Sequence, residues 1–235
     1  MLEALFHFFG NTWLEMLVVA VIAYLLGSIN FAIIVTRKFS KTDIRDYGSG
    51  NAGATNVLRS QGVLPAAITA VGDLGKSVVS VLIGRYLFVQ FVDPTYEQLE
   101  YVGIIGMYVA GFFCVIGHLY PLYFGFRGGK GVITGFGLFL ILDYRVALLG
   151  LLAFLIILFT TRMVSLGSMV GAWTIVILTF VFRTYMYEQP MIICWFCTVV
   201  GAIIAAILTV KHRTNIVRII KGTENKVSFG KTNRG

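Results

Sequence analysis

The sequence predicts an all-α integral membrane protein that crosses the bilayer several times. Of its 235 residues, 57% are hydrophobic and only 13% are charged, whereas soluble domains carry roughly 25% charged residues. The apolar residues form runs along the whole chain, and a membrane-spanning helix needs about 20 of them. We therefore expect residues 1–235 to form a single membrane-embedded domain, with a short basic tail from about residue 211.

Seven apolar segments are expected to be transmembrane helices. They comprise residues 12–36, 63–92, 100–120, 131–142, 146–160, 164–184 and 190–210. The fourth and fifth are short for complete crossings, so the alternative is five crossings plus a re-entrant pair. Both counts place the termini on opposite sides. No basic residue precedes the first apolar run, so we expect an uncleaved first span and no secretory signal.

The basic residues predict the orientation in the membrane. Fifteen of the 19 Lys and Arg residues lie in the connections after the first, third and fifth apolar segments and in the tail. The other connections hold only Arg145 and Arg183, among several acidic residues. Because basic connections stay in the cytoplasm, the N-terminus is predicted outside and the C-terminus inside the cell. The same bias accounts for the net charge of +8 without a nucleic-acid partner.

A polar, glycine-rich stretch follows the first apolar segment and reads GSGNAGATNVLR over residues 48–59. Glycines let backbone N–H groups approach a ligand closely, and Arg suits a phosphate or carboxylate best. The further potential donors are Ser49, Asn51, Thr55, Asn56 and Arg59. The stretch matches G-x-G-x-x-G, but it follows a basic loop and no strand, so a dinucleotide site is not expected. An anion site at the membrane surface is predicted.

A second glycine cluster precedes the fourth apolar segment. It consists of Gly128, Gly129, Lys130 and Gly131. A glycine loop that leads into a helix offers free N–H groups and the positive end of the helix dipole, which suit a phosphate. Lys130 adds a full charge. The alternative is a simple turn whose lysine follows the positive-inside bias.

A third polar cluster lies at the end of the last apolar segment. His212 and Asn215 are three residues apart, so they share a helix face, and Lys221 and Glu224 follow. Histidine is the usual proton-transfer residue near neutral pH; the alternative is a polar residue at a helix end. Ser165 opens the sixth apolar segment, where it caps the helix or contacts a ligand.

Some polar residues lie inside the apolar segments. Asp73 and Lys76 are three apart in the second segment, and charges at that depth are usually paired or functional. His118 is expected to be structural. Cys194 and Cys197 match C-x-x-C but lack a redox context, so they are expected to pack as small apolar residues.

Together the three clusters, residues 48–59, 117–131 and 212–224, resemble the motifs of the PlsY family. These are acyl-phosphate-dependent glycerol-3-phosphate acyltransferases of bacterial membranes, and the likeness runs from about Tyr24 to Lys226. The family implies that a fatty acyl group passes from acyl phosphate to the sn-1 hydroxyl of glycerol 3-phosphate, which gives lysophosphatidic acid for phospholipid biosynthesis and releases phosphate.

The resemblance also implies the surroundings of the reaction. It implies seven helices in the bacterial inner (plasma) membrane, with the active site facing the cytoplasm. No metal, cofactor or acyl-CoA is expected. A soluble enzyme that supplies acyl phosphate is the implied functional link.

By position, the resemblance implies a role for each motif residue. Ser49, Arg59, His212 and Asn215 are expected to be catalytic. Substrate and phosphate binding is assigned to Asn51, Thr55, Asn56, Gly128, Gly129, Lys130, Gly131, Ser165, Lys221 and Glu224. We expect His212 to act as the base or to align the hydroxyl, with a substrate phosphate as the alternative base, and Ser49 to be an oxyanion donor in preference to a nucleophile. The chain departs from the family at Asn30, where many relatives have Pro, at Gly75 and at Thr214.

The rival interpretation is a transporter of a small organic anion or phosphate ester. Such a protein places charges near the bilayer midplane in broken helices, often within inverted repeats. No such repeat is visible, and the polar clusters fall at the ends of the apolar segments. The acyltransferase is therefore the preferred prediction.

Overall fold

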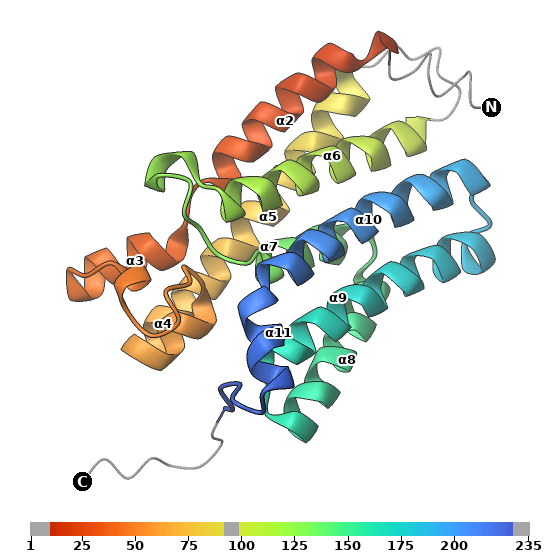
Figure 1. Ribbon diagram of the computed structural model, residues 1–235. Helices are drawn as coiled ribbons and strands as arrows, with labels where there is room; N and C mark the ends of the chain where they lie inside the picture. Colours follow the sequence, from red (N-terminus) through yellow and green to blue (C-terminus); the bar gives the residue numbers. More distant parts are fainter. Residues whose placement is uncertain (1–9, 92–98, 228–235) are drawn as a thin grey trace, which may run out of the picture.

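The computed structural model describes residues 10–91 and 99–227, and this part of the chain is helical without strands (Figure 1). Six segments in it are long and apolar enough to cross a membrane. They are Trp13–Ser40, Val63–Phe91, Tyr101–Phe124, Tyr144–Thr161, Val164–Met186 and Met191–Lys211. The predicted all-α membrane fold is confirmed.

The first apolar segment is broken, contrary to the single helix expected over 12–36. Helix α2 (Trp13–Gly27) ends before Asn30, and α3 (Phe31–Ser40) begins after it. The Asn30 side chain caps α3, because its Oδ1 accepts a hydrogen bond from Ile33 N at 3.1 Å and its Nδ2 donates to Ala52 O at 3.4 Å. The family departure at this position therefore provides a helix cap.

The fourth apolar segment forms the short helix α7 (Val132–Leu142). Its 11 residues extend about 16 Å at 1.5 Å per residue, roughly half of a 30 Å hydrocarbon core. The fifth segment, also expected to be short, forms the longer helix α8 (Tyr144–Thr161), which is able to cross. The number of complete crossings and the side of each terminus remain predictions.

The long helices form two groups with α7 between them (Figure 1). Helices α2, α5 (Val63–Phe91) and α6 (Leu99–Leu119) pack together, and so do α8, α9 (Val164–Val181) and α10 (Met191–Lys211). Glycines allow close helix contact within the first group: a Cβ at Gly84 would lie 2.5 Å from Gly106 O. Small residues are typical of helix interfaces in membranes.

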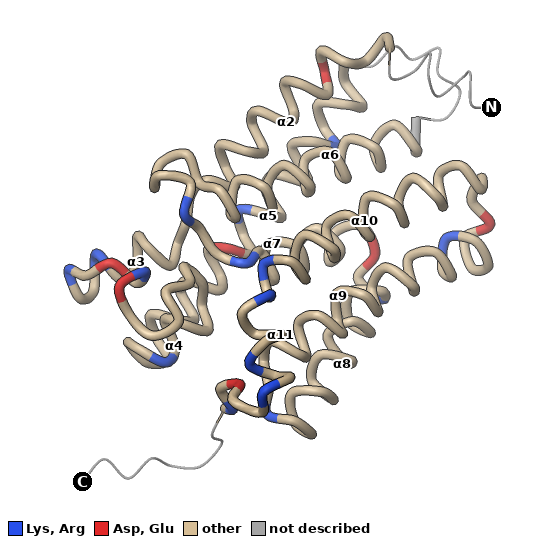
Figure 2. Tube along the Cα trace, viewed as in Figure 1, with Lys and Arg blue, Asp and Glu red and all other residues tan. Residues whose placement is uncertain are grey.

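The charged residues are distributed unevenly along the molecule. Figure 2 shows Lys and Arg gathered at the end that holds α3, α4 (Ala54–Gln61) and α11 (Arg213–Ile220). Fewer charges lie at the opposite end, where α9 passes into a π-helical turn, Phe182–Met186. All three polar clusters of the sequence meet at the first end.

Candidate active site

The first polar loop is built around Asn56 of α4. Gly48 and Gly50 have φ of +57° and +68°, which only glycine adopts easily, and a Cβ at Gly48 would overlap Asn56 Oδ1. Asn56 Oδ1 accepts a hydrogen bond from Ser49 N at 3.1 Å. Its Nδ2 donates to the carbonyls of Ile44, Tyr47 and Asn51. Asn56 was expected to bind a ligand, but its amide donors are used within the loop, which it holds in shape.

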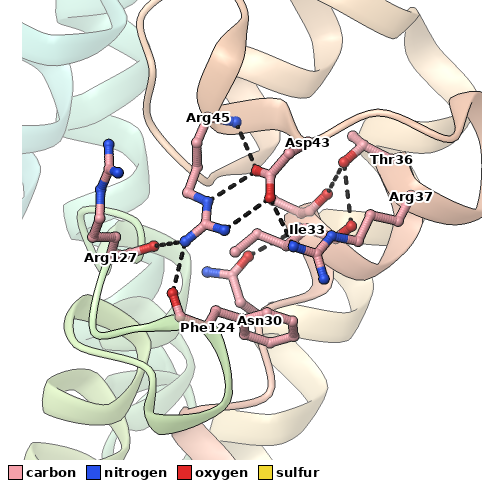
Figure 3. A network of polar contacts seen from close by, with 9 residues as sticks. Asn30, Ile33, Thr36, Arg37, Asp43, Arg45, Phe124 and Arg127 are labelled. Carbon is pink, nitrogen blue, oxygen red and sulfur yellow. Dashed lines mark hydrogen bonds and ion pairs between the residues drawn. The ribbon is translucent and has the colours of Figure 1, made fainter.

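Arg45 ties this loop to the second glycine cluster (Figure 3). Its guanidinium donates to both carboxylate oxygens of Asp43, at 2.9 and 2.8 Å, and to the carbonyls of Phe124 (2.7 Å) and Arg127 (3.3 Å). The hydrogen bonds from Arg45 hold the pKa of Asp43 well below its usual range, although burial opposes them. Arg45 is one of the fifteen basic residues that predict the orientation, and this second role was not predicted from the sequence.

The second glycine cluster packs against the first loop. A Cβ at Gly129 would overlap His118 Nε2 and lie 2.5 Å from Ala52 O, so the absence of a side chain permits this contact. Gly131, with φ of +79°, is the N-cap residue of α7 and provides no side-chain cap. The first N–H groups of α7 are therefore left for a ligand.

Asp73, Lys76 and His118 form a buried polar cluster next to both loops. Lys76 Nζ lies 2.9 Å from Asp73 Oδ1 and 2.9 Å from His118 Nδ1. It also donates to the carbonyls of Gly27 and Ile29, at 2.9 and 2.7 Å, where α2 ends. The cluster therefore pairs its charges and stabilises the break before α3, in line with the ion pair and the structural histidine considered from the sequence.

Glu224 organises the third wall of the site. Its Oε1 accepts hydrogen bonds from Asn215 Nδ2 at 2.7 Å and Ser165 Oγ at 2.8 Å, and its Oε2 accepts one from Arg218 Nε at 2.9 Å. Asn215 Oδ1 in turn accepts a hydrogen bond from Lys130 Nζ. The third motif, the start of α9 and the second glycine cluster are thus linked by one network.

The three walls enclose a cavity of about 310 Å³. Eleven of the fourteen residues predicted for the site line it: Ser49, Asn51, Thr55, Asn56, Arg59, Lys130, Gly131, Ser165, His212, Asn215 and Glu224. Gly128, Gly129 and Lys221 are not among its described lining residues. Gly128 and Gly129 serve loop packing, and Lys221 is exposed at the end of α11.

The cavity also has lining residues that the sequence argument did not assign to it. Arg218, Ser168 and Phe154 belong to it, as do Asp73 and His118 of the buried cluster. The i, i+3 spacing from Asn215 to Arg218 was a usable signal for Arg218. Val132, Ile133, Phe154 and Ser168 also line a second, apolar cavity of about 180 Å³ between α7, α8, α9 and α10.

Ser49, Asn51, Thr55 and Arg59 line the cavity with side-chain donors that bind no other described residue. Within the described part of the chain, neither the Ser49 hydroxyl nor the Arg59 guanidinium makes a hydrogen bond. Asn51, Thr55 and Ser49 surround the entrance to α4. A free guanidinium on a cavity wall suits a phosphate or carboxylate.

Burial lowers the pKa values of two further residues of the cavity, Lys130 and His212. Burial lowers the pKa of Lys130 to about 8, although Glu224 opposes the shift. Burial and the nearby Lys130 charge lower the pKa of His212 to about 4. The His212 Nδ1 lies 2.8 Å from Leu208 O, which places the proton on Nδ1 and leaves Nε2 as an acceptor. His212 is therefore neutral and Lys130 largely charged at pH 7.

Glu224 is ionised in this network. Burial raises its pKa, but hydrogen bonds from Arg218, Asn215 and Ser165 outweigh that effect and lower it overall. The described residues contain no group of three His, Cys, Asp or Glu side chains placed to hold a metal ion. The site therefore provides cationic and neutral donors around two fixed carboxylates, Glu224 and Asp73.

Comparison with known proteins identifies the family. A family profile described as glycerol-3-phosphate acyltransferase matches residues 17–222. A glycerol-3-phosphate acyltransferase of Thermoanaerobacter pseudethanolicus is 39% identical over 88% of this chain and 93% of its own length. A glycerol-3-phosphate acyltransferase of Coxiella burnetii is 40% identical over 89% of this chain and 96% of its own length. The chain belongs to the glycerol-3-phosphate acyltransferase family.

The fold of the acyltransferase agrees with this assignment. The crystal structure of PlsY, an integral membrane glycerol 3-phosphate acyltransferase, in its glycerol 3-phosphate form has a TM-score of 0.75 and 31% identity, with 91% of this chain and 96% of that chain covered. The lysophosphatidic acid form of PlsY has a TM-score of 0.72 and 30% sequence identity to this chain. The predicted PlsY resemblance is confirmed, the acyltransferase is a multi-pass membrane enzyme, and the transporter alternative is not retained.

Proposed function

We propose that the acyltransferase moves a fatty acyl group from acyl phosphate to the sn-1 hydroxyl of glycerol 3-phosphate, which yields lysophosphatidic acid and phosphate. The observation that carries the proposal is the junction of two cavities: a polar one with unpartnered Arg59 and an apolar one between α7 and α10. Such a junction suits a reaction between an anionic alcohol and an acyl donor. The glycerol 3-phosphate and lysophosphatidic acid forms of the PlsY crystal structures support it.

The two phosphate groups are assigned to opposite walls. Glycerol 3-phosphate binds through its phosphate at Lys130 and the open N-terminus of α7, where a charge and free N–H groups meet. The phosphate of the acyl donor binds at Arg59, with Ser49, Asn51 and Thr55 beside it. Glu224 fixes Asn215, and Asn215 orients Lys130.

The acyl chain of the donor extends into the apolar cavity. That cavity continues from the polar one past Val132, Ile133 and Phe154. Burial of each methylene group contributes about 0.8 kcal/mol, so the chain binds the donor firmly while the phosphate stays in the polar cavity. The acyl carbonyl is then held at the junction, close to both phosphate sites.

The transfer is a direct attack of the sn-1 hydroxyl on the acyl carbonyl. Nε2 of neutral His212 takes the hydroxyl proton as the new C–O bond forms. Ser49 Oγ donates a hydrogen bond to the developing oxyanion. The bond between the acyl carbon and the phosphate oxygen then breaks, and phosphate leaves as the stable anion. Acyl phosphate is already activated, so no covalent enzyme intermediate is needed.

The membrane side of the reaction follows from the charges. The basic end of the molecule, which holds the polar cavity, has the residue distribution of a cytoplasmic face. We assign the active site to the cytoplasmic side of the bacterial inner membrane. There a soluble enzyme is able to deliver acyl phosphate.

Product identification tests the proposal. Detergent-purified protein is incubated with glycerol 3-phosphate and either acyl phosphate or acyl-CoA, and lysophosphatidic acid and free phosphate are measured. We expect equimolar products with acyl phosphate only. Ser49→Ala and His212→Ala should each lower turnover by about 10²-fold or more. Turnover with acyl-CoA alone would refute the donor, and near-wild-type turnover of both variants would refute the assigned roles.

A further inference from the structure

A second polar cavity lies at the end of the molecule away from the acyl-transfer site. Its volume is about 610 Å³. Its polar lining consists of Arg85, Tyr101, Asp143, Tyr144, Arg145, Arg183, Tyr187 and Gln189. Ser165 and Arg183 lie in the same continuous helical segment, and 18 residues of helix separate them by about 27 Å. The two cavities share no lining residue.

Arg183 is a buried cation in this cavity without a carboxylate partner. Its relative exposure is 5%. Its Nη1 donates to Gln189 Oε1 at 2.6 Å, and its guanidinium lies 5.9 Å from the centre of the Tyr108 ring. No described Asp or Glu lies within ion-pair distance. A buried charge is normally paired, and an ionisable residue within a membrane-spanning segment usually marks a functional site.

None of the other described charges of the cavity forms an ion pair with Arg183. Arg85 makes no hydrogen bond or ion pair within the described chain. The Arg145 guanidinium lies over the Tyr187 ring at 4.9 Å, and its Nε is 3.6 Å from Asp143 Oδ1. Asp143 is already engaged, because it accepts hydrogen bonds from Tyr187 Oη at 2.5 Å and from the first N–H groups of α8. The described lining thus carries three cations and one committed carboxylate.

We propose that this cavity binds a phosphate-bearing anion, with Arg183 at its base and Arg85 and Arg145 at its rim. Three guanidinium groups provide the planar donors that phosphate oxygens accept best. The aromatic and apolar lining, which includes Ile104, Met107 and Leu142, leaves space beside the phosphate for part of a larger ligand. A phospholipid headgroup and a free phosphate ion share this chemistry.

A stability assay tests this site without using the acyltransferase reaction, and the three arginine variants separate it from the acyl-transfer site, where inorganic phosphate is also expected to bind. The melting temperature of the detergent-purified protein is measured with phosphatidylglycerol, with diacylglycerol as the phosphate-free lipid, and with inorganic phosphate. Variants Arg183→Gln, Arg145→Gln and Arg85→Gln remove the three cations singly. Arg213→Gln, an exposed arginine outside both cavities, is the matched control.

We expect phosphatidylglycerol or inorganic phosphate to raise the melting temperature of the wild type and of Arg213→Gln by about 3–6 °C. The rise should fall by half or more in Arg145→Gln and Arg85→Gln. Arg183→Gln should abolish the rise with phosphatidylglycerol and leave, with inorganic phosphate, only the part that the acyl-transfer site provides; if that variant does not fold, the two rim variants decide. A rise with the lipid alone identifies a headgroup site, and a rise with inorganic phosphate identifies a site for the free ion. An equal rise in all variants, or no rise with either ligand, would overturn the proposal.

Discussion

Arg45 and Arg59 lie 14 residues apart on the same side of the molecule, yet their surroundings differ. Arg45 makes four side-chain hydrogen bonds and holds two loops together, and only 17% of its side chain is exposed. Arg59 lines the polar cavity and has no partner in the described chain. The residue type is the same, so the difference lies in which donors the fold has already used.

The other polar residues near the polar cavity also differ in whether the protein already uses their donors and charges. Asn56, Asp73 and Lys76 are buried and have their donors or charges matched by the protein. Ser49 and His212 face the cavity with an atom left for a substrate. We expect substitutions of the matched residues to act mainly on stability, and substitutions of Ser49 or His212 to act mainly on activity.

His212→Ala should give the largest effect. Loss of the base should lower kcat by about 10²–10⁴-fold, while the melting temperature falls by only about 2–4 °C because one hydrogen bond, to Leu208 O, is lost. Steady-state kinetics and a melting curve on the same preparation measure both. Arg213→Ala is the matched control. A kcat within threefold of wild type would exclude His212 as the base.

Arg45→Ala should have the largest effect on stability. It leaves Asp43 without its main partner and frees the carbonyls of Phe124 and Arg127, so we expect a loss of about 2–3 kcal/mol, measured as thermal or denaturant unfolding in detergent. Arg37→Ala is the control, because Arg37 makes one ion pair with Asp43 and 53% of its side chain is exposed; it should cost at most about 0.5 kcal/mol. Equal losses in both variants would contradict the anchoring role.

Lys130→Arg should change the pH dependence. Because the pKa of Lys130 is lowered to about 8, its charge is present below that pH and is lost as the pH rises through it. The kcat/KM of the wild type should therefore fall above about pH 8. Arg stays charged, so the variant should lack this decline even if its activity is lower. Lys38→Arg, an exposed lysine on α3, should keep the wild-type profile. A decline above pH 8 in Lys130→Arg would exclude Lys130 as its cause.

Asn30→Ala should have the smallest effect. It removes the cap of α3 and the bond to Ala52 O, at a cost of about 1 kcal/mol, or roughly 2–4 °C in melting temperature. Asn30→Ser keeps a neutral capping acceptor and should recover part of that loss. A variant with Ala as stable as the wild type would show that Lys76 alone stabilises the break between α2 and α3.

The sequence predicted the membrane fold and most of the cavity for a physical reason. Apolar runs of about 20 residues report helices directly, and polar groups concentrated in three short clusters had to meet at one end. The sequence did not show which motif residues hold the loops in shape and which are left for a ligand. Asn56 and Arg59 are three residues apart in one motif. Only the folded loop shows that Asn56 donates its hydrogen bonds to backbone carbonyls, whereas Arg59 donates none to the described chain.

Long-range pairing accounts for the rest of what was missed. Arg45 contacts Phe124 and Arg127, about 80 residues away. The hydropathy pattern does not predict such long-range pairs. The break at Asn30 depends on Lys76 from another helix. The far cavity collects charges from three separate segments, at Arg85, at Asp143 and Arg145, and at Arg183, none of which forms a motif by itself.

The most direct test of the account is Arg59→Gln. The central claim is that Arg59 has no partner among the described residues because it binds a substrate phosphate. Turnover with acyl phosphate and glycerol 3-phosphate and the melting temperature are measured together, with Arg37→Gln as the control. We predict a fall in kcat/KM of about 10²-fold or more with a melting temperature within 1–2 °C of wild type. Wild-type kcat/KM, or a fall explained by unfolding, would contradict the claim.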